Sequence, residues 1–145
     1  MPANQDHPFR AMNFRVEIDG IASSSFSECS GLASSVDVVE YREGADPSLS
    51  ARKLPGLRKY ANITLKRGVT QDKELFNWYR NILNGEVDRR NGSIILQDDK
   101  RNDVLRWQFR NGWICKYEGP TLNGHSSEVA METIEICHEG LELED

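Results

Sequence analysis

Alternation of apolar and polar residues with a period of two recurs along this chain and constrains its fold most strongly. Phe14, Val16 and Ile18 alternate with charged residues, and the segment 105–110 repeats the same pattern. Successive side chains of a β-strand point to opposite faces, so this pattern predicts half-buried strands. We count about seven or eight such segments. No βαβ rhythm accompanies them, which favours a mainly β fold, an antiparallel β-barrel or sandwich.

One segment has helical periodicity instead. Thr70 stands where an N-cap residue is expected, Asp72 and Glu74 add negative charge to the first turn, and Gly85 follows the last apolar residue. We therefore predict a single flanking α-helix over residues 71–84. Its apolar face is formed by Leu75, Trp78, Tyr79, Ile82 and Leu83. Its wet face is formed by Asp72, Lys73, Asn77, Arg80 and Asn81.

Residues 42–61 show no periodicity. Gly44, Pro47, Pro55 and Gly56 interrupt any regular element in this segment. A loop of this length inside a compact domain is uncommon and tends to be functional. We predict an extended loop that reaches a neighbouring subunit.

Size and charge set the broad class. A length of 145 residues fits one domain, so we assign residues 13–145 to a single domain that follows a flexible N-terminal arm over residues 1–12. The net charge of −5 argues against a nucleic-acid binder. Basic residues gather between 52 and 67 and acidic residues between 139 and 145, a segregation that suits head-to-tail contact between copies.

The chain carries no recognisable export or membrane signal. A run of about 18 apolar residues is absent, and the first residues lack the basic start and apolar stretch of a signal peptide. We expect synthesis and assembly in the cytoplasm and no direct membrane insertion.

Residue types that carry catalysis are present without a recognisable arrangement. There is no G-x-S-x-G motif, and Cys29, Cys115 and Cys137 have neither metal-ligand nor disulfide-framework spacing. Adjacent strand residues such as Cys137 and His138 point to opposite faces. We therefore expect no enzymatic activity, no metal and no cofactor. Two alternatives from other classes stay open, a hydrolase that uses Cys29 or a serine and a small β-barrel that binds an apolar ligand.

The order of several segments resembles a known family. These segments are NFRVEIDGI, FSECSGL, EYREG, KLPGLRKYANITLKRGV, KELFNWYRNI, NGSIILQD, YEGPTLN and SSEVAMETIEICHEGLE. They resemble the tail-tube protein family of contractile phage tails and contractile injection systems, over about residues 13–142. The resemblance implies a small β-barrel with one flanking helix, similar to the type VI secretion tube protein.

The resemblance also implies a structural role. Hexameric rings would stack into a rigid hollow tube, which contraction of a surrounding sheath drives through a target envelope. The implied partners are further copies of the chain, a sheath protein, baseplate and tail-terminator proteins, and effector cargo or a genome in the lumen. The implied location is a phage tail or tail-like particle. Within the same family, a tube-initiating or baseplate-proximal paralogue present in a single ring stays as an alternative.

The resemblance assigns contacts residue by residue. EYREG and KLPGLRKY match the extended loop of the family, which gives as inter-subunit contact candidates Tyr41, Arg42, Glu43, Lys53, Leu54, Pro55, Gly56, Leu57, Arg58, Lys59 and Tyr60. The wet face of the helix is the candidate sheath-facing surface. Segment 126–136 would help to line the inner barrel, and the slip of its apolar phase near Thr133 predicts a β-bulge.

Overall fold

The computed structural model describes residues 8–21, 25–45 and 50–145. Within these ranges the chain forms nine strands and one helix. They are β1 Phe14–Ile18, β2 Glu28–Ser30, β3 Ser34–Tyr41, β4 Arg52–Tyr60, β5 Ile63–Gly68, α1 Glu74–Leu83, β6 Arg90–Gln97, β7 Asp103–Glu118, β8 Met131–Cys137 and β9 Gly140–Leu143. The prediction of a mainly β, antiparallel fold with one flanking helix is confirmed. Most of the predicted arm, 1–12, and Pro47 lie outside the described residues.

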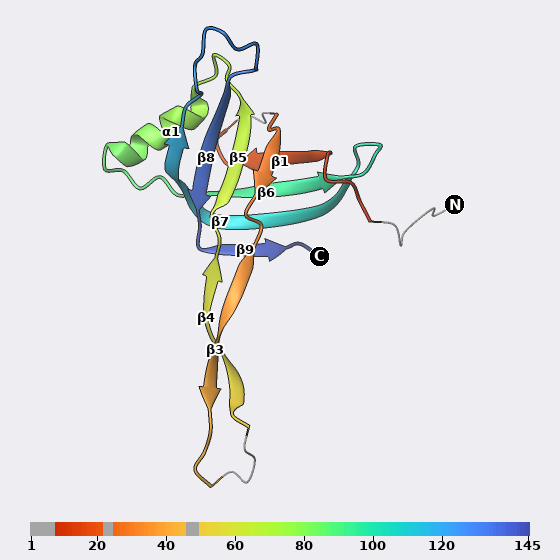
Figure 1. Cartoon of the computed structure of the whole chain (residues 1–145), viewed down its shortest axis with the longest axis vertical. Coiled ribbons are helices and arrows are strands. Elements are labelled where there is room, and N and C mark those ends of the chain that lie inside the picture. The colour runs from red at the N-terminus through yellow and green to blue at the C-terminus, as the bar shows by residue number, and fades with distance from the viewer. Residues whose placement is uncertain (1–7, 22–24, 46–49) are drawn as a thin grey trace.

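Strand β7 joins two layers of one folded sheet. Its first half pairs with β6 and β9, and its second half pairs with β8, in the strand order β1-β6-β7-β8-β5-β2. Figure 1 shows β1, β6 and β9 running across the molecule while β5 and β8 run along it. The bend in β7 falls near Asn111, which has a φ of 53°. Residues Asp103–Glu118 are therefore one long, bent strand.

The core lies between these two layers. Alternating positions of β1 and β5–β8 supply most of it, as the sequence pattern predicts, and α1 adds Leu75 and Trp78. Its buried members are Val16, Ile18, Ile63, Leu65, Leu75, Trp78, Ile94, Phe109, Ile114, Ile134 and Ile136. We call strands β1, β2 and β5–β9, helix α1 and the described segments that connect them the body of the molecule.

Helix α1 begins later than predicted. The Thr70 hydroxyl accepts a hydrogen bond from the backbone N–H of Asp72, and the Asp72 carboxylate accepts one from the N–H of Glu74. These bonds hold residues 70–74 in turns, so Thr70 is not the N-cap residue, and Lys73 occupies that position without a side-chain cap. Thr70 and Asp72, which were expected to begin the helix, instead form hydrogen bonds in the segment that precedes it.

The end of α1 agrees with the sequence, but one residue of its apolar face does not. Gly85 has a φ of 88° and follows the helix, as expected for a residue that ends one. Leu83, predicted on the buried face, is 61% exposed. Leu83 is the last helical residue, and the sheet that covers Leu75 and Trp78 does not extend to it.

The predicted bulge near Thr133 is wrong. The pairing of β5 with β8 is continuous from Ile63–Ile136 to Gly68–Met131. The apolar phase slips in the sequence because Glu132 occupies a buried position of β8. The register shift lies on the other side of β8, in β7 between Ile114 and Lys116.

Candidate assembly surface

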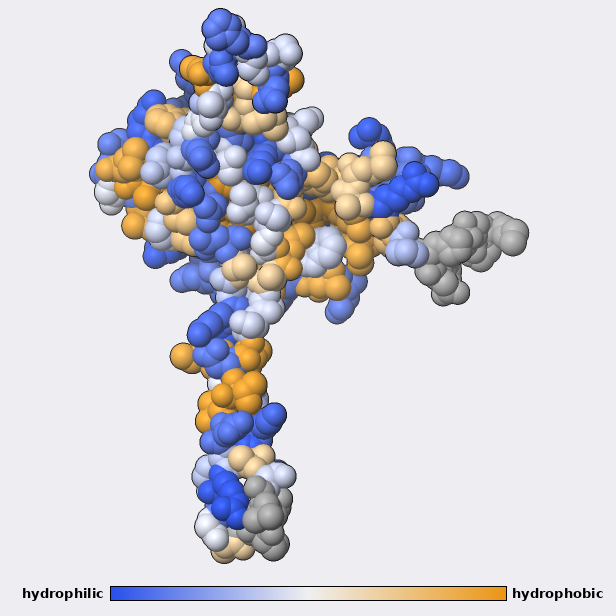
Figure 2. Space-filling model, viewed as in Figure 1, coloured by the Kyte–Doolittle hydropathy of each residue, from blue (hydrophilic) through white to orange (hydrophobic). Residues whose placement is uncertain are grey.

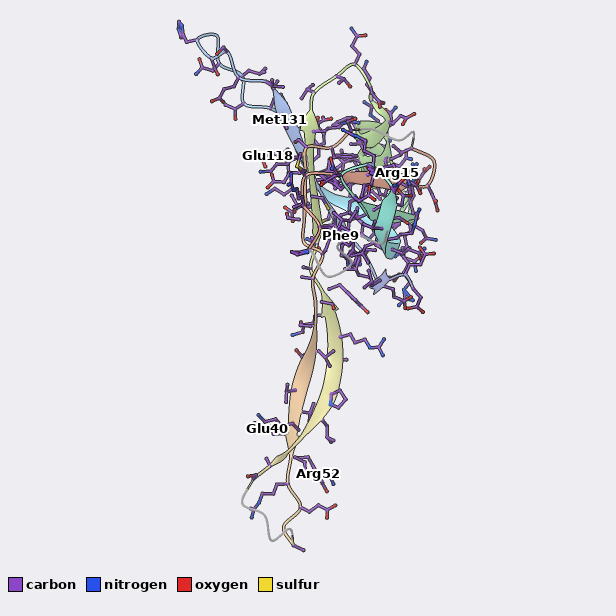
Figure 3. All side chains as sticks on the ribbon, turned by 90° about the vertical axis from the view of Figure 1, so that its right-hand side faces the viewer. Phe9, Arg15, Glu40, Arg52, Glu118 and Met131 are labelled. Carbon is purple, nitrogen blue, oxygen red and sulfur yellow. The ribbon has the colours of Figure 1, made fainter. Side chains whose placement is uncertain are left out.

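Strands β3 and β4 form a two-stranded antiparallel ribbon that projects from the body. The pairing runs from Ser34–Tyr60 at the root to Tyr41–Arg52 near the far end. Figures 1 and 3 show the ribbon extending along the long axis, with Glu40 and Arg52 far from the body. No third strand of the described chain pairs with it. Both outer edges therefore present backbone groups that a second chain can pair with.

The ribbon corrects the prediction of an irregular loop over 42–61. Val36 pairs with Arg58 and Val38 pairs with Pro55, so β4 holds one residue more than β3 in this interval. This is a β-bulge, and Gly56 lies in it, where a Cβ would approach the Asp37 carbonyl oxygen to 3.1 Å. Proline and glycine are tolerated at bulges and on edge strands. The same two residues that suggested a loop thus fit a bulged strand at an edge.

The ribbon carries apolar side chains that no other part of the described chain covers. Figure 2 shows them as orange patches on its stem. Cross-strand pairs place Val38 beside Pro55 on one face and Val39 beside Leu54 on the other. Relative exposures between 44% and 74% are found for Val36, Val38, Val39, Tyr41, Leu54 and Leu57. Because both faces are apolar, folding of this chain alone cannot bury the ribbon, and contact with another molecule can.

The ribbon also carries most of the basic cluster seen in the sequence. Arg52, Lys53, Arg58 and Lys59 are exposed, and the Lys59 ammonium lies 3.3 Å from a carboxylate oxygen of Asp37. The two remaining members belong to β5. The Lys66 ammonium lies 3.3 Å from the Glu28 carboxylate, and Arg67 is buried. The positive charge available to a partner is therefore concentrated on the ribbon.

The structure brings the predicted contact residues together on this one element. Tyr41 and the residues from Lys53 to Tyr60 lie in the paired strands, and Arg42 and Glu43 follow β3 directly. The Tyr41 hydroxyl donates a hydrogen bond to the Glu43 carboxylate, 3.3 Å away. Tyr60 differs from the others because its ring packs on His138 of the body, with 5.5 Å between centroids.

A set of close contacts fixes the root of the ribbon to the body. The N–H of Ala61 donates to the Ala33 carbonyl at 3.0 Å. The two ring nitrogens of His138 lie 3.0 Å from the Ala61 carbonyl oxygen and 3.1 Å from the Gly140 carbonyl oxygen. Gly31 has a φ of 89°, and a Cβ there would overlap the Asn62 carbonyl oxygen. The ribbon is therefore anchored by interactions that local sequence patterns do not reveal.

The predicted sheath-facing residues divide into two groups. Lys73, Asn77 and Arg80 are exposed, and Arg80 donates a hydrogen bond to the Asn77 side chain at 3.1 Å. The other two turn toward their own molecule. Asn81 donates to the Asp88 carboxylate at 3.0 Å, and a carboxylate oxygen of Asp72 lies 3.7 Å from the Arg67 guanidinium. Asp72 is nevertheless exposed, so Asn81 is the one residue of the predicted set that is half-buried.

A buried ion pair lies where β5, β8 and the approach to α1 meet. The Arg67 Nε donates to the Glu132 carboxylate at 2.6 Å, with side-chain exposures of 5% and 8%. The Tyr117 hydroxyl donates to the other Glu132 oxygen at 2.8 Å, and burial followed by the hydrogen bond with Glu132 raises the pKa of Tyr117. Arg67 also donates to the Asp72 carbonyl at 3.4 Å. This network holds the beginning of the helix against the sheet.

The body has open strand edges at β1, β2 and β9, and an apolar hollow lies beside the first two. In the described chain, β1 pairs along its length only with β6, and β2 pairs only with β5. A hollow of about 400 Å³ lies next to these strands, lined in part by Phe9, Phe14, Leu32, Leu96 and Trp107. The sheet is therefore not closed within one copy of the chain.

Other classes of site find little support in the described residues. No group of three or more His, Cys, Asp or Glu side chains there could hold a metal ion. In residues 8–21, 25–45 and 50–145 no helix has the length and apolar character needed to cross a membrane. Burial raises the pKa of the Cys29 thiol to about 11, which opposes the thiolate that a cysteine nucleophile requires.

Comparison with known proteins gives a consistent result. The family model described as T4-like virus tail tube protein gp19 matches residues 10–142. No match is found among curated proteins. The fold is similar to a chain in the cryo-EM structure of an extracellular contractile injection system, the PVC sheath-tube complex in the extended state. The two chains are 27% identical with a TM-score of 0.85, and the match covers 97% of this chain and 93% of that one.

Two further solved structures are similar to this chain. A chain in the structure of the anti-feeding prophage cap, described as the tube-terminating cap, is 25% identical with a TM-score of 0.84, covering 95% of this chain and 91% of that one. Hcp1 from Flavobacterium johnsoniae is 16% identical with a TM-score of 0.57, covering 90% and 94%. The second likeness concerns the fold alone.

Proposed function

The chain belongs to the T4-like virus tail tube protein family, and on that premise we propose that its copies form hexameric rings that stack through the β3–β4 ribbon into a hollow tube. The observation that carries this proposal is the ribbon itself. It places apolar side chains, unpaired strand edges and a basic cluster outside the body, in a chain whose family model matches residues 10–142.

The shape of the molecule supports stacking along its long axis. Figures 1 and 3 show the ribbon at one end and the connection between β7 and β8 at the opposite end. Copies arranged head to tail along this axis bring the ribbon of one copy toward the body of the next. A contact repeated in one direction generates a ring or a filament, depending on whether its rotation closes. Obligate interfaces of this kind bury about 2,000 Å² or more.

Ring formation is supported by the open edges of the body. Strands β1 and β2 end the sheet, so pairing or packing between neighbouring copies would remove exposed edges. The apolar hollow beside these strands offers further surface for the same contact. We assign lateral contacts to the body and axial contacts to the ribbon.

The proposed partners are inferred from the assemblies in which the similar chains occur. Their structures are described as a sheath-tube complex, a tube-terminating cap and a baseplate. We propose that a sheath protein contacts the exposed side of α1 at Lys73, Asn77 and Arg80, and that baseplate and terminator proteins cap the ends. Effector cargo or a genome would occupy the lumen of a particle assembled in the cytoplasm.

The role we propose is structural and involves no catalysis. A tube-initiating paralogue in a single ring is the nearest alternative, and the copy number in intact particles separates the two. A small ligand-binding barrel is a weaker alternative because apolar side chains of the described chain pack between the two layers of the body.

The test is a ribbon truncation. Ser35 and Lys59 are paired across the root, so Asn-Gly in place of residues 36–58 closes a short hairpin while keeping the root intact. We expect the full chain to form rings or tubes in negative-stain images and the truncated chain to sediment as small species with nearly the same melting temperature. Removing only residues 46–58 is a poorer design because it leaves most of β3 unpaired.

Three outcomes would count against the proposal. Tubes of normal length from the truncated chain would show that the ribbon does not join successive rings. A full chain that stays monomeric at high concentration, where the tail tube family predicts assembly, would argue against a tube role altogether. If the truncated chain does not fold, the ribbon stabilises the single copy, which is not expected for so exposed an element.

A further inference from the structure

Two of the three cysteines lie on adjacent strands and share one face of the sheet. Trp113 of β7 pairs with Cys137 of β8, so their side chains are on the same side. The Asn62 amide contacts both the Cys115 sulfur, at 3.6 Å, and the Glu135 carboxylate, at 3.3 Å, so Cys115 lies on the face that Glu135 and Cys137 share. Ile114 directly precedes Cys115 and Ile136 directly precedes Cys137, and both isoleucines are buried in the core. The two thiols are thus on the face of the sheet that points away from the core.

A bulge brings these two thiols together. The register shift between Ile114 and Lys116 makes Cys115 the extra residue of β7. The Cys115 Sγ donates to the Glu135 carbonyl at 3.5 Å, and the Cys137 Sγ donates to the Trp113 carbonyl at 3.7 Å. Each thiol therefore lies against the backbone of the opposite strand, and Cys115 is near enough to help raise the pKa of the Cys137 thiol.

The pair is accessible to small molecules. Cys115 and Cys137 are half-buried, not sealed. The amide of Asn62, which is exposed, lies 3.6 Å from the Cys115 Sγ. Disulfides require Cα atoms about 4.4–6.8 Å apart, a range that includes close neighbours on paired strands. Cys115 and Cys137 are diagonal neighbours, whose Cα atoms lie about 7–8 Å apart in a regular sheet, so the two strands must move closer at the bulge before the sulfurs can bond.

We propose that Cys115 and Cys137 form a redox pair that hydrogen peroxide converts into an intramolecular disulfide between β7 and β8. One thiol is oxidised to a sulfenic acid as peroxide is reduced to water. The second thiol attacks this sulfur, the S–S bond forms and a second water leaves. The two thiols together lose two electrons and two protons, which the peroxide accepts.

The surroundings make this oxidation slow. Burial, and then the neighbouring Cys115, raise the pKa of the Cys137 thiol to about 11, so little thiolate is present at neutral pH. A reducing cytoplasm keeps such thiols reduced. A particle that has left the cell meets oxidants without that protection, and the bond would then lock the bent strand β7 to β8. The inference holds for an isolated copy as well as for a tube.

The test uses the full chain, treated with hydrogen peroxide or left reduced, then unfolded and alkylated. We expect the treated chain to lose about 2 Da before alkylation, to retain one alkylatable thiol, and to yield a cross-linked peptide pair containing residues 115 and 137. Closing this loop should raise the melting temperature by roughly 5–10 °C. Cys29→Ser is the matched control and should show the same loss of about 2 Da but retain no alkylatable thiol.

Several results would overturn the inference. Three alkylatable thiols after treatment would mean that no bond forms, and cross-links between chains would mean that the thiols pair with another copy. Cys115→Ser and Cys137→Ser should each abolish the loss of mass. If either variant still shows it, another cysteine is the partner. The measurement on the parent chain stands even if one variant folds poorly.

Discussion

The body and the ribbon are both antiparallel β-structure, yet they handle apolar side chains in opposite ways. In the body, Ile63, Ile114 and Ile136 are fully buried between two layers. In the ribbon, Val38 and Leu57 are 64% and 74% exposed because no second layer covers them. Similar β-forming residues thus serve a core in one region and leave an open surface in the other.

The difference separates folding from assembly. An isolated two-stranded hairpin is marginal in water, whereas a sheet with a covered face is stable. We therefore expect substitutions in the body to change the free energy of unfolding of a single copy, and substitutions in the ribbon to change association between copies. The following predictions test this division, from the largest expected effect on unfolding to the smallest.

The largest effect is expected from Glu132→Ala. The substitution removes the carboxylate that accepts hydrogen bonds from Arg67 and Tyr117, leaving a buried guanidinium without its closest partner. Breaking a buried pair from one side costs about 3–5 kcal/mol. Urea unfolding of the purified variant measures the loss.

A double variant provides the control for this ion pair. Arg67→Met combined with Glu132→Leu removes both charges and should recover much of the stability, because the Coulomb attraction only offsets the cost of dehydration. If Glu132→Ala unfolds at nearly the parental urea concentration, the ion pair does not stabilise the body.

The second prediction concerns Gly31→Ala at the junction of body and ribbon. The added Cβ meets the Asn62 carbonyl oxygen, and the φ of 89° is unfavourable for alanine. We expect a loss of about 2–3 kcal/mol in the free energy of unfolding. Gly44→Ala is the matched control because a Cβ there has no neighbour within 4 Å. Equal stability of the two variants would show that the junction relaxes freely.

The third prediction is a small pH-dependent effect at the other side of the body. The hydrogen bond from Arg90 is the main cause that lowers the pKa of Asp88, and Asn81 adds a second. A lowered folded pKa means that this stabilisation is present above the unfolded value near 3.8 and is lost as the pH falls through the folded value.

The partly exposed position of this ion pair limits its size. Asp88→Asn should therefore cost less than about 1 kcal/mol at pH 7, and nothing near pH 2. Denaturant melts at the two pH values give the comparison. If Asp88→Asn still lowers the free energy of unfolding near pH 2, the loss comes from the amide side chain and not from the missing charge.

Much of the body could be predicted from the sequence because its strands follow local rules. The alternation around Val16 identified β1, and Gly85 identified the end of α1. The errors arose where a distant partner changes what a residue can do. From the sequence, Glu132 is interpreted as a solvated carboxylate because its partner, Arg67, lies 65 positions away in the chain.

The structure places the predicted contact residues on one element, but the local structure predicted for that element was wrong. Resemblance to the family pointed to the contact segment, and those residues do share the projecting element. Pro55 and Gly56 suggested a loop because turn propensity is local, whereas a bulged edge strand depends on the partner strand. The contacts of His138 at the root had no sequence signal, since they join segments 77 positions apart.

The smallest effect on unfolding, and the sharpest test of the division, is expected from Val38→Lys. Val38 is 64% exposed and touches no second layer, so a lysine there should change the free energy of unfolding by less than about 0.5 kcal/mol. In a tube the same lysine would be buried against another copy without a partner charge, which should abolish long tubes. Val87→Lys makes the same change at a 55% exposed position of the body and should leave tubes intact. Sedimentation and negative-stain images of both variants, alongside their urea melts, measure the two properties separately. If Val38→Lys destabilises the single copy, the ribbon is part of its folding unit, and if it assembles like Val87→Lys, the apolar stem of the ribbon is not an interface.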